Sequence, residues 1–377
     1  MTAGVPARRP ERARVSLPWT IRAERRLEVP RWLPLATTIG AVVVALLIGG
    51  VILAVAGGDP IAIYAHILRS SFGSLGVLSD TLVKATPLIL TGLACALAFR
   101  MRLWNIGAEG QLLMGAWAAS AVVLVPIVPP GTPAIITLPV MMVAAMLAGG
   151  AYGAIPGILK AVRGVNEIIV TLMLNYIAAL WLSYWVFGPW NEGGFPITPQ
   201  FPPEGWLPRL DDLAEAIPAF SGLTVHLGLL IGLIAAVLVH FLLFRSRLGY
   251  EIRLIGDSPR AARYAGVNVV RNTIVVFAIS GALAGLAGMS EVSGVVHRLQ
   301  LTISPGYGFT AVIVAYIAKL NPYGVVVASI AFGALILAGR EIQPSGIPAM
   351  IQGIILFSLI ASEVFLRYRF RIERRAA

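Results

Sequence analysis

Long apolar segments that alternate with arginine-bearing gaps constrain the fold of this chain more than any other feature. About ten of these segments approach the roughly 20 residues that a helix needs to cross a hydrocarbon core of about 30 Å. Lys and Arg beside membrane spans are retained in the cytoplasm, so their distribution reports the topology. With the N-terminus placed inside, inner gaps hold all Lys and Arg residues except Arg69, Lys84, Arg209, Arg298 and Arg340. The pattern predicts an all-α integral membrane protein of about ten transmembrane helices with both termini cytoplasmic.

The composition agrees with a membrane protein. Only 12% of the residues are charged and 58% are hydrophobic, whereas a soluble domain has about 25% charged residues. The net charge of +11 then serves orientation and attraction to anionic lipid, so we expect membrane lipid and no nucleic acid as a partner. The single cysteine, Cys95, lies inside an apolar segment, and the four histidines have no ligand-like spacing. We therefore expect no disulfide framework, no metal site and no cofactor.

The apolar segments divide the chain into three parts. Residues 1–33 carry eight arginines and predict a cytoplasmic tail with little internal order rather than a signal peptide. Residues 34–366 form the transmembrane domain, and residues 367–377 form a second basic tail. Short surface helices are expected at Pro60–Leu68 and Asp211–Ile217. The expected spans are 34–56, 77–98, 106–127, 134–158, 166–187, 223–244, 272–290, 308–320, 323–339 and 346–366, of which the eighth is short enough to be tilted, re-entrant or broken.

The outer loop, 188–222, is acidic and rich in proline. It carries five acidic residues against the single Arg209. This composition fits either a solvated loop or a docking surface for an external partner.

The segment 100–111 is the densest polar cluster near the membrane. Its two glycines permit close backbone approach, and Asn105, Glu109 and Gln111 enter the start of an apolar run. Ionisable residues within spans usually face a cavity or a partner. A helix that begins inside the membrane also points its positive N-terminal end into any pathway. The alternative is a helix cap with a first-turn Glu at the cytoplasmic surface.

Asn166 and Glu167 open a further apolar run, in which Asn175 interrupts an otherwise apolar stripe. A buried Asn usually hydrogen-bonds between helices, and we favour this structural role for Asn175 over a place in a pathway. The candidate residues for lining or gating a translocation pathway are Asn105, Glu109, Gln111, Asn166, Glu167 and Asn175.

The largest inner loop, 245–271, contains a capped helix. Ser258 and Pro259 suit the N-cap and the first helical position, and Gly266 suits a left-handed terminator. Between them the sequence Arg-Ala-Ala-Arg-Tyr-Ala predicts about two helical turns at the membrane surface. Capping at both ends favours a docking element for another protein over simple attraction of the arginines to lipid headgroups.

The remaining sequence motifs indicate helix packing and exclude several classes of enzyme. The run 281–288, with glycines four residues apart, predicts close helix packing. None of the three lysines follows a glycine, so the phosphate-binding loop of ATPases is missing. Neither a His-Glu-x-x-His nor a Gly-x-Ser-x-Gly motif occurs. We therefore expect no enzyme activity, and any ATP hydrolysis would take place on a partner subunit.

Several fragments follow one another in an order and spacing typical of a single family. They are Asn105-Ile-Gly-Ala-Glu-Gly-Gln111, 166–176, Gly188-Pro-Trp190, 261–268, 280–288, Gly308-Phe-Thr-Ala311 and Asn321-Pro322. This set resembles the permease subunits of ATP-binding-cassette (ABC) importers, in the nucleoside and simple-sugar uptake branch that is related to branched-chain amino acid and ribose permeases. The resemblance covers roughly residues 77–365 and leaves out the N-terminal tail.

The resemblance implies a fold like that of the vitamin B12 importer (type II), in the cell membrane of a bacterium or archaeon. It implies a nucleoside or simple sugar as solute, a second permease subunit, a pair of ATPase domains that are often fused, and an external binding protein or lipoprotein. The outer loop is then the candidate contact for the binding protein. The residues implied in coupling to the ATPase are Arg253, Asp257, Ser258, Arg260, Arg263, Tyr264 and Gly266.

Two other classes of function also fit the residues. A secondary transporter driven by an ion gradient would need a coupling site, for which Glu109, Glu167 or Lys84 is available. A structural membrane subunit would use its polar residues only to pack helices. The capped inner loop favours the ATP-driven importer, because a self-sufficient carrier does not need to dock an ATPase.

Overall fold

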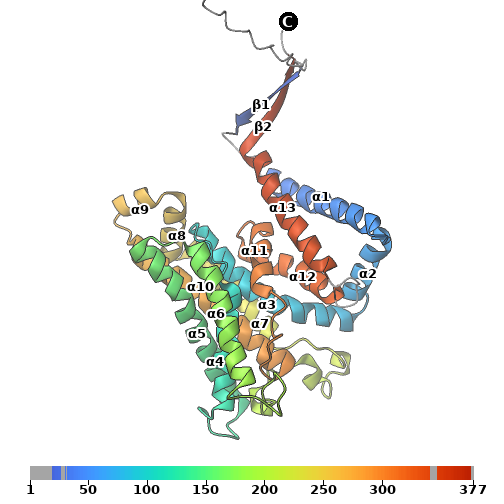
Figure 1. Ribbon diagram of the computed structural model, residues 1–377, viewed down its shortest axis with the longest axis vertical. Helices are drawn as coiled ribbons and strands as arrows, with labels where there is room; N and C mark the ends of the chain where they lie inside the picture. Colours follow the sequence, from blue (N-terminus) through green and yellow to red (C-terminus); the bar gives the residue numbers. More distant parts are fainter. Residues whose placement is uncertain (1–18, 27–29, 31, 340–345, 375–377) are drawn as a thin grey trace, which may run out of the picture.

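The computed structural model describes residues 19–26, 30, 32–339 and 346–374, and shows a bundle of helices (Figure 1). Residues 1–18 of the expected N-terminal tail and Arg340 lie outside the described residues. Seven helices are long and apolar enough to cross a membrane: α1 (Leu33–Val55), α3 (Leu75–Arg100), α5 (Ala134–Arg163), α6 (Glu167–Phe187), α7 (Gly228–Arg245), α10 (Val269–Glu291) with its π-helical extension Val292–Val296, and α13 (Ile347–Arg367). Three shorter apolar helices are α4 (Ala108–Leu124), α11 (Tyr307–Ile317) and α12 (Pro322–Ala338). Each of the ten apolar stretches is therefore helical, and the expected eighth span is the shortest of these helices.

Helices α3 and α10 form the centre of the bundle. In the most apolar stretch of 18 residues in α3, 94% of the residues are buried inside the protein. In the corresponding stretch of α10, 72% of the residues are buried. Helix α10 packs against α5, α4 and α3, whereas α1 packs mainly against α13. In the outer helices α1, α6 and α13 less than a third of the corresponding stretch is buried, as expected for surfaces that face lipid or another membrane subunit. The protein is a multi-pass helical membrane protein.

Glycines allow α5 and α10 to touch along their backbones. A Cβ atom on Gly285 would collide with the carbonyl oxygen of Ala145, and one on Gly281 would collide with that of Gly149. In apolar surroundings small residues favour association because they let helices approach closely. The packing role predicted for the run 281–288 is confirmed.

The short elements outside the spans differ in part from the expectation. Helix α2 (Pro60–Phe72) is longer than the predicted surface helix, and α9 (Pro259–Tyr264) is the predicted inner helix. Helix α8 (Arg247–Asp257) was not expected. The predicted helix Asp211–Ile217 is wrong, since the outer loop holds only 3₁₀ turns at Pro203–Gly205, Leu210–Leu213 and Pro218–Phe220.

The outer loop avoids an α-helix because its acidic side chains bond to the backbone. Asp212 Oδ2 accepts from the Arg209 N–H at 2.7 Å, and Asp211 Oδ1 accepts from the Gly222 N–H at 2.7 Å. Such local bonds compete with helical ones, and Pro218 ends any continuation.

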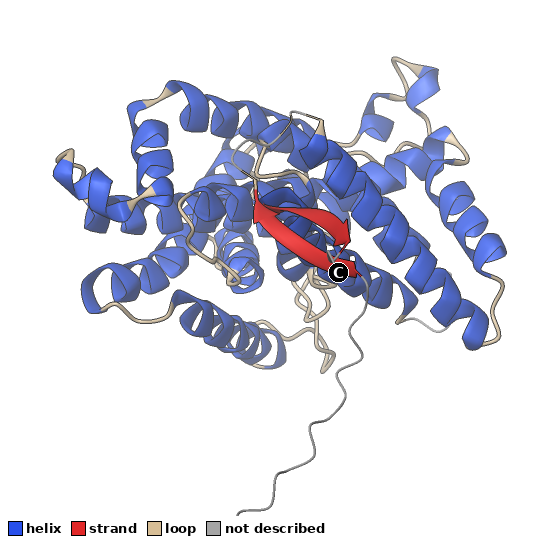
Figure 2. Cartoon of the chain, turned by 90° about the horizontal axis from the view of Figure 1, so that it is seen from above, coloured by secondary structure: helices blue, strands red, loops and turns tan. Residues whose placement is uncertain are grey.

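The two tails pair with each other, which corrects the expectation of little order over residues 19–25. Strand β1 (Trp19–Arg25) lies antiparallel to β2 (Tyr368–Arg374), with Ile21 opposite Ile372 (Figure 2). Both segments alternate apolar and polar residues, a period-two signal that the high arginine content obscures. Strands β1 and β2 lie at one end of the bundle, the end that also carries α9 (Figure 1).

We predict that Gly285→Val disrupts the bundle, because the added side chain separates α5 from α10. The apparent melting temperature of the detergent-solubilised chain, measured by fluorescence-detected size exclusion, should fall by at least about 10 °C. Gly40→Val is the matched control, since a Cβ atom at Gly40 meets nothing within 4 Å. Equal melting temperatures for the two variants would contradict the proposed importance of this contact.

Candidate functional site

Helix α4 begins inside the bundle rather than at its surface. Asn105, which precedes it, exchanges two hydrogen bonds with Gln111, at 2.9 and 3.0 Å, and donates to Ser280 Oγ of α10 at 2.8 Å. Ser280 in turn donates to the carbonyl of Ala94 at 2.7 Å. Ala94 lies six residues before the end of α3, or about 9 Å along the helix axis. The chain therefore turns back into the interior after α3 before α4 starts.

Asn175 of α6 ties the start of α4 to its neighbour. Its Oδ1 accepts from the Gly110 N–H at 2.8 Å, and its Nδ2 donates to the Ile106 carbonyl at 2.9 Å. The side chain is 5% exposed. The first N–H groups of a helix have no partner within that helix, and Asn175 supplies one for α4. This contact agrees with the structural role that we favour for Asn175.

The N-termini of α4 and α11 meet at Glu109. Glu109 Oε2 accepts from the backbone N–H of Gly308, at 2.7 Å, in the first turn of α11. A Cβ atom on Gly308 would collide with the backbone nitrogen of Glu109, so only glycine allows this approach. The buried carboxylate thus lies where the positive ends of two helices converge. Glu109 links two helices, a role that a cap at the cytoplasmic surface would not have.

Asn166 and Glu167 do not join this cluster. Asn166 is exposed and caps α6, accepting from the Ile168 N–H at 2.9 Å. Glu167 pairs with Lys160 at 2.7 Å. Eight residues of α6, or about 12 Å of rise, separate Glu167 from Asn175. The structure therefore brings together Asn105, Glu109, Gln111 and Asn175, and leaves the other two candidates at the end of α6.

The structure contains a second buried polar cluster, which the sequence pattern did not predict. Lys84 of α3 lies 3.5 Å from Glu291 Oε1 of α10, and the Tyr307 hydroxyl donates to the same oxygen at 2.7 Å. Both charged side chains are less than a tenth exposed. Glu291 carries the signal that could have found it, because it is an ionisable residue within an apolar helix.

The outer loop is anchored on the end of α10 by Arg209. Its guanidinium donates to the carbonyls of Gly294, at 2.8 Å, and Val295, at 3.2 Å, and contacts His297 Nε2 at 2.8 Å. These carbonyls belong to the π-helical turn, whose last acceptors have no partner in the helix. Burial, and next the charge of Arg209, lower the pKa of His297. Arg209 therefore holds the loop as an ordered cap.

At the opposite end, α9 presents an exposed surface. Tyr264 is 93% exposed, and Arg260 and Arg263 are exposed beside it. Ser258 caps the helix by accepting from the Ala261 N–H at 3.3 Å, and Gly266 has the expected left-handed φ of +78°. The capped helix predicted for this loop is confirmed.

Helix α8 fixes α9 to the bundle. A Cβ atom on Gly256 would collide with the Arg100 carbonyl of α3, so the helices touch. Arg253 and Arg100 both lie over the Phe244 ring, 5.7 and 5.5 Å from its centroid. The coupling candidate Asp257 is exposed at the end of α8.

A hydrogen bond also joins α8 to α10. Asn272 Nδ2 donates to Glu251 Oε2 at 2.7 Å, and this bond is the main reason that the pKa of Glu251 is lowered. The surface formed by α8 and α9 is therefore attached directly to both central helices.

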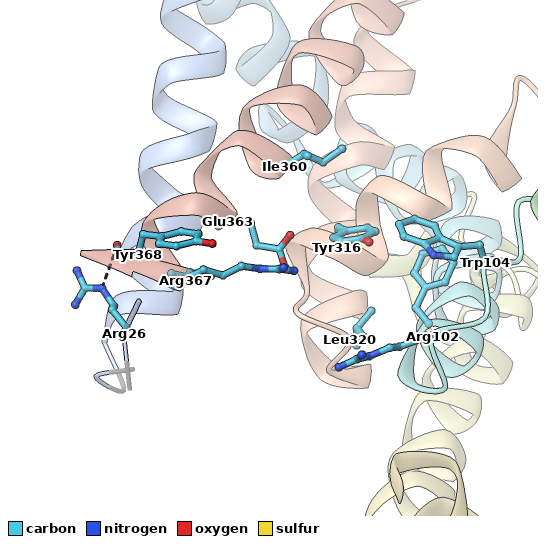
Figure 3. A pocket seen from close by; sticks show the side chains of 11 residues that line it. Arg26, Arg102, Trp104, Tyr316, Leu320, Ile360, Glu363, Arg367 and Tyr368 are labelled. Carbon is cyan, nitrogen blue, oxygen red and sulfur yellow. Dashed lines mark hydrogen bonds and ion pairs between the residues drawn. The ribbon is translucent and has the colours of Figure 1, made fainter. Parts of the chain in front are cut away.

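A cavity of about 1040 Å³ opens near the same end (Figure 3). Trp104 and Tyr316 stack on one side with ring centroids 5.7 Å apart, while Glu363, Arg367 and Tyr368 of the α13 end line the other. Arg367 and Glu363 pair at 3.3 Å. The cavity separates the α1–α13 pair from the central helices.

These features define a class: a multi-pass helical membrane protein in which one helix starts inside the interior and a capped helix is exposed at one end. Residues 77–361 match the family described as the branched-chain amino acid transport system / permease component, and the chain belongs to that family.

Curated relatives extend the match over nearly the whole chain. The glucose ABC transporter permease protein TsgB13 of Haloferax volcanii is 37% identical over 93% of each chain. The guanosine ABC transporter permease protein NupP of Bacillus subtilis is 35% identical over 87% of this chain and 93% of its own length. The nucleoside ABC transporter permease protein NupB of Lactococcus lactis is 30% identical over 88% of this chain and 90% of its own length. No solved structure matches the chain.

The resemblance to ABC permeases is thereby confirmed. The chain is the permease subunit of an ABC transporter, in a family whose members are not themselves the ATPases. An ABC permease works with an ATPase and a substrate-binding protein.

We predict that Asn175→Ala destabilises the chain more than Asn166→Ala. The first variant leaves the Gly110 N–H and the Ile106 carbonyl unpaired in the interior, at about 1–3 kcal/mol each. The second removes an exposed cap worth about 1 kcal/mol. The apparent melting temperature should fall by about 5 °C or more for Asn175→Ala and by less than half of that for Asn166→Ala. The reverse order would contradict the role assigned to Asn175.

Proposed function

We propose that this chain forms part of the translocation pathway of an ATP-driven importer for a nucleoside or simple sugar. The observation that carries the proposal is the α8–α9 surface, which is exposed, capped at both ends and fixed to the central helices. An element that only attracts lipid headgroups would not need such fixation. The fold we propose is the type II permease fold, with ten spans and both termini cytoplasmic, in the cell membrane of a bacterium or archaeon.

The proposed topology is supported by the distribution of charge over the bundle. The paired tails and α9 lie at one end, and the loops that follow α4 and α6 lie at the other (Figure 1). Arginines are concentrated at the first end and acidic residues in the loop 188–222 at the second. Because positive charge is retained inside, the α9 end is the cytoplasmic one.

The proposed partners follow from this orientation. A pair of ATPase domains, fused in one chain, docks on the α8–α9 surface, with Arg253, Asp257, Ser258, Arg260, Arg263, Tyr264 and Gly266 as the coupling residues. A second permease subunit packs against the exposed apolar helix faces, and an external binding protein or lipoprotein docks on the outer loop. Arg209 makes that loop an ordered platform, which supports a docking role over that of a solvated loop.

Within this permease, Asn105, Glu109, Gln111 and Asn175 hold the junction of α4 and α11, and we propose that this junction gates the pathway. Asn166 and Glu167 stay predictions for the pathway, with Asn166 exposed at the inner end of α6. The relatives are named for glucose, guanosine and nucleosides. These solutes are neutral and rich in hydroxyl groups, which suits polar side chains of low net charge.

The proposed function is tested by uptake into proteoliposomes that contain the chain with its ATPase and permease partners. Uptake of radiolabelled guanosine or glucose should require internal ATP and the binding protein. It should continue when ionophores collapse the proton and sodium gradients. Uptake that needs an ion gradient but no ATP would instead support the secondary-transporter alternative.

We predict that Arg263→Ala/Tyr264→Ala uncouples the importer, because it removes exposed side chains from α9 without disturbing its buried residue Ala262. ATP-dependent uptake should fall about tenfold or more, equivalent to about 1.4 kcal/mol, while the amount of chain in the membrane is unchanged.

The matched control is Arg69→Ala, which removes an exposed arginine from α2, away from α9. It should transport normally. Normal uptake by the α9 variant would refute docking at this surface.

A further inference from the structure

The buried pair of Lys84 and Glu291 leaves part of its hydrogen-bonding capacity unused. Glu291 Oε1 faces both the Lys84 ammonium and the Tyr307 hydroxyl. Glu291 Oε2 is buried and has no hydrogen-bond partner in the part of the chain that the structure describes. An ammonium group has three donors, and the structure assigns one of those of Lys84 to Glu291. Charges are costly in a membrane interior and mark solute or ion sites.

A small cavity of about 240 Å³ is lined by Lys84 of this pair, at the end of the bundle that carries the outer loop. Its lining includes Asp80 and Lys84 of α3, Arg209 of the outer loop, Thr224 before α7 and Leu337 of α12, together with the π-helical turn. Its volume is below the roughly 300–1,000 Å³ of pockets that hold drug-sized ligands. A monosaccharide ring or the ribose of a nucleoside fits this scale better than a larger ligand.

The polar groups around the cavity are held in place by bonds within the protein. Thr224 donates to Asp80 Oδ1 at 2.6 Å, which fixes the carboxylate. Arg209 is fixed by the carbonyls of Gly294 and Val295. The π-helical turn that supplies these carbonyls begins directly after Glu291, and such turns occur often at functional sites. The cavity therefore combines a fixed carboxylate and a fixed ammonium within a small volume.

We propose that this cavity is a solute subsite that binds neighbouring hydroxyl groups of a sugar ring. Asp80 accepts a hydrogen bond from one hydroxyl, and Lys84 donates to the oxygen of another. Glu291 is a positioning residue, which holds the Lys84 ammonium through the 3.5 Å contact. The inference rests on the proposed function, since it assumes that the solute enters from the end that carries the outer loop.

The test uses a cysteine placed in the cavity wall. The only native cysteine, Cys95, is buried, so Leu337→Cys introduces the reactive thiol. Membranes with the full complex are treated with an impermeant maleimide, with and without millimolar D-glucose or guanosine. We expect one of these solutes to slow labelling of Leu337→Cys at least threefold. Ile127→Cys, exposed in the loop that follows α4 and outside the outer loop, should be labelled at the same rate in both conditions.

The role of the carboxylate is tested in the Leu337→Cys background. Asp80→Asn retains the acceptor for Thr224 but removes the charge, and it should abolish protection at the same solute concentration. Asp59→Asn, which keeps the acceptor that caps α2 and removes a charge that does not line the cavity, should leave protection intact. Labelling that neither solute slows, or protection that survives Asp80→Asn, would overturn the subsite.

The ion pair is tested by removing its charges singly and together. Lys84→Met or Glu291→Gln leaves one buried charge unpaired and should lower the amount of chain in the membrane. The double variant Lys84→Met/Glu291→Gln should restore that amount but not the protection of the thiol, because the donor to the solute is gone. If it restores both, the pair only packs α3 against α10 and the role of Lys84 is refuted.

Uptake by the unmodified complex separates this inference from the proposed function. ATP-driven uptake of a probe that fails to protect the thiol would refute the subsite alone. Protection without ATP-driven uptake would support the subsite and refute the importer.

Discussion

The start of α4 inside the protein is the constraint on which the rest of the structure depends. A helix that begins in an apolar interior exposes N–H groups that water cannot satisfy there. Asn175 meets this need for α4 by accepting from the Gly110 N–H, and Glu109 of α4 meets the same need for α11 by accepting from the Gly308 N–H. Because these bonds come from α6 and α11, the position of α4 fixes the positions of both helices. The same residues therefore explain why a polar motif lies in an apolar region.

Close backbone packing makes this interior possible. Glycines along α10 allow α5 and α4 to approach until their backbones touch, as the contacts of Gly281, Gly285 and Gly288 show. Dense packing leaves little room for side chains around the polar network, so its hydrogen bonds are shielded from solvent and from lipid. In such surroundings a buried polar group is stable only when its partners are positioned accurately. The glycine run and the Asn105 network thus depend on each other.

The sequence revealed local features better than contacts between distant segments. The periodic apolar runs located the ten helices, and Ser258 with Gly266 located α9, because spans and caps are local signals. Helix α8 was missed because its polar, arginine-containing sequence was interpreted as loop. The pair of Lys84 and Glu291 joins residues 207 positions apart, and nothing in one sequence states that two such residues meet. The strand pair was missed for the same reason, and because the high arginine content obscures the alternation within each strand.

Helix α10 offers a physical connection between the two ends of the permease. Near its N-terminus Asn272 bonds to Glu251 of α8, and at its C-terminus Glu291 pairs with Lys84. These two positions are 19 residues apart, which corresponds to about 29 Å along the axis. A rigid helix that contacts both the α8 surface and the Lys84–Glu291 pair can link conformational changes at the two places. This requires that each place has two arrangements with different free energies. The π-helical turn after Glu291 is the part of α10 with the least regular bonding. A change at the α8–α9 surface would therefore reach the outer cavity most directly as a change in this turn.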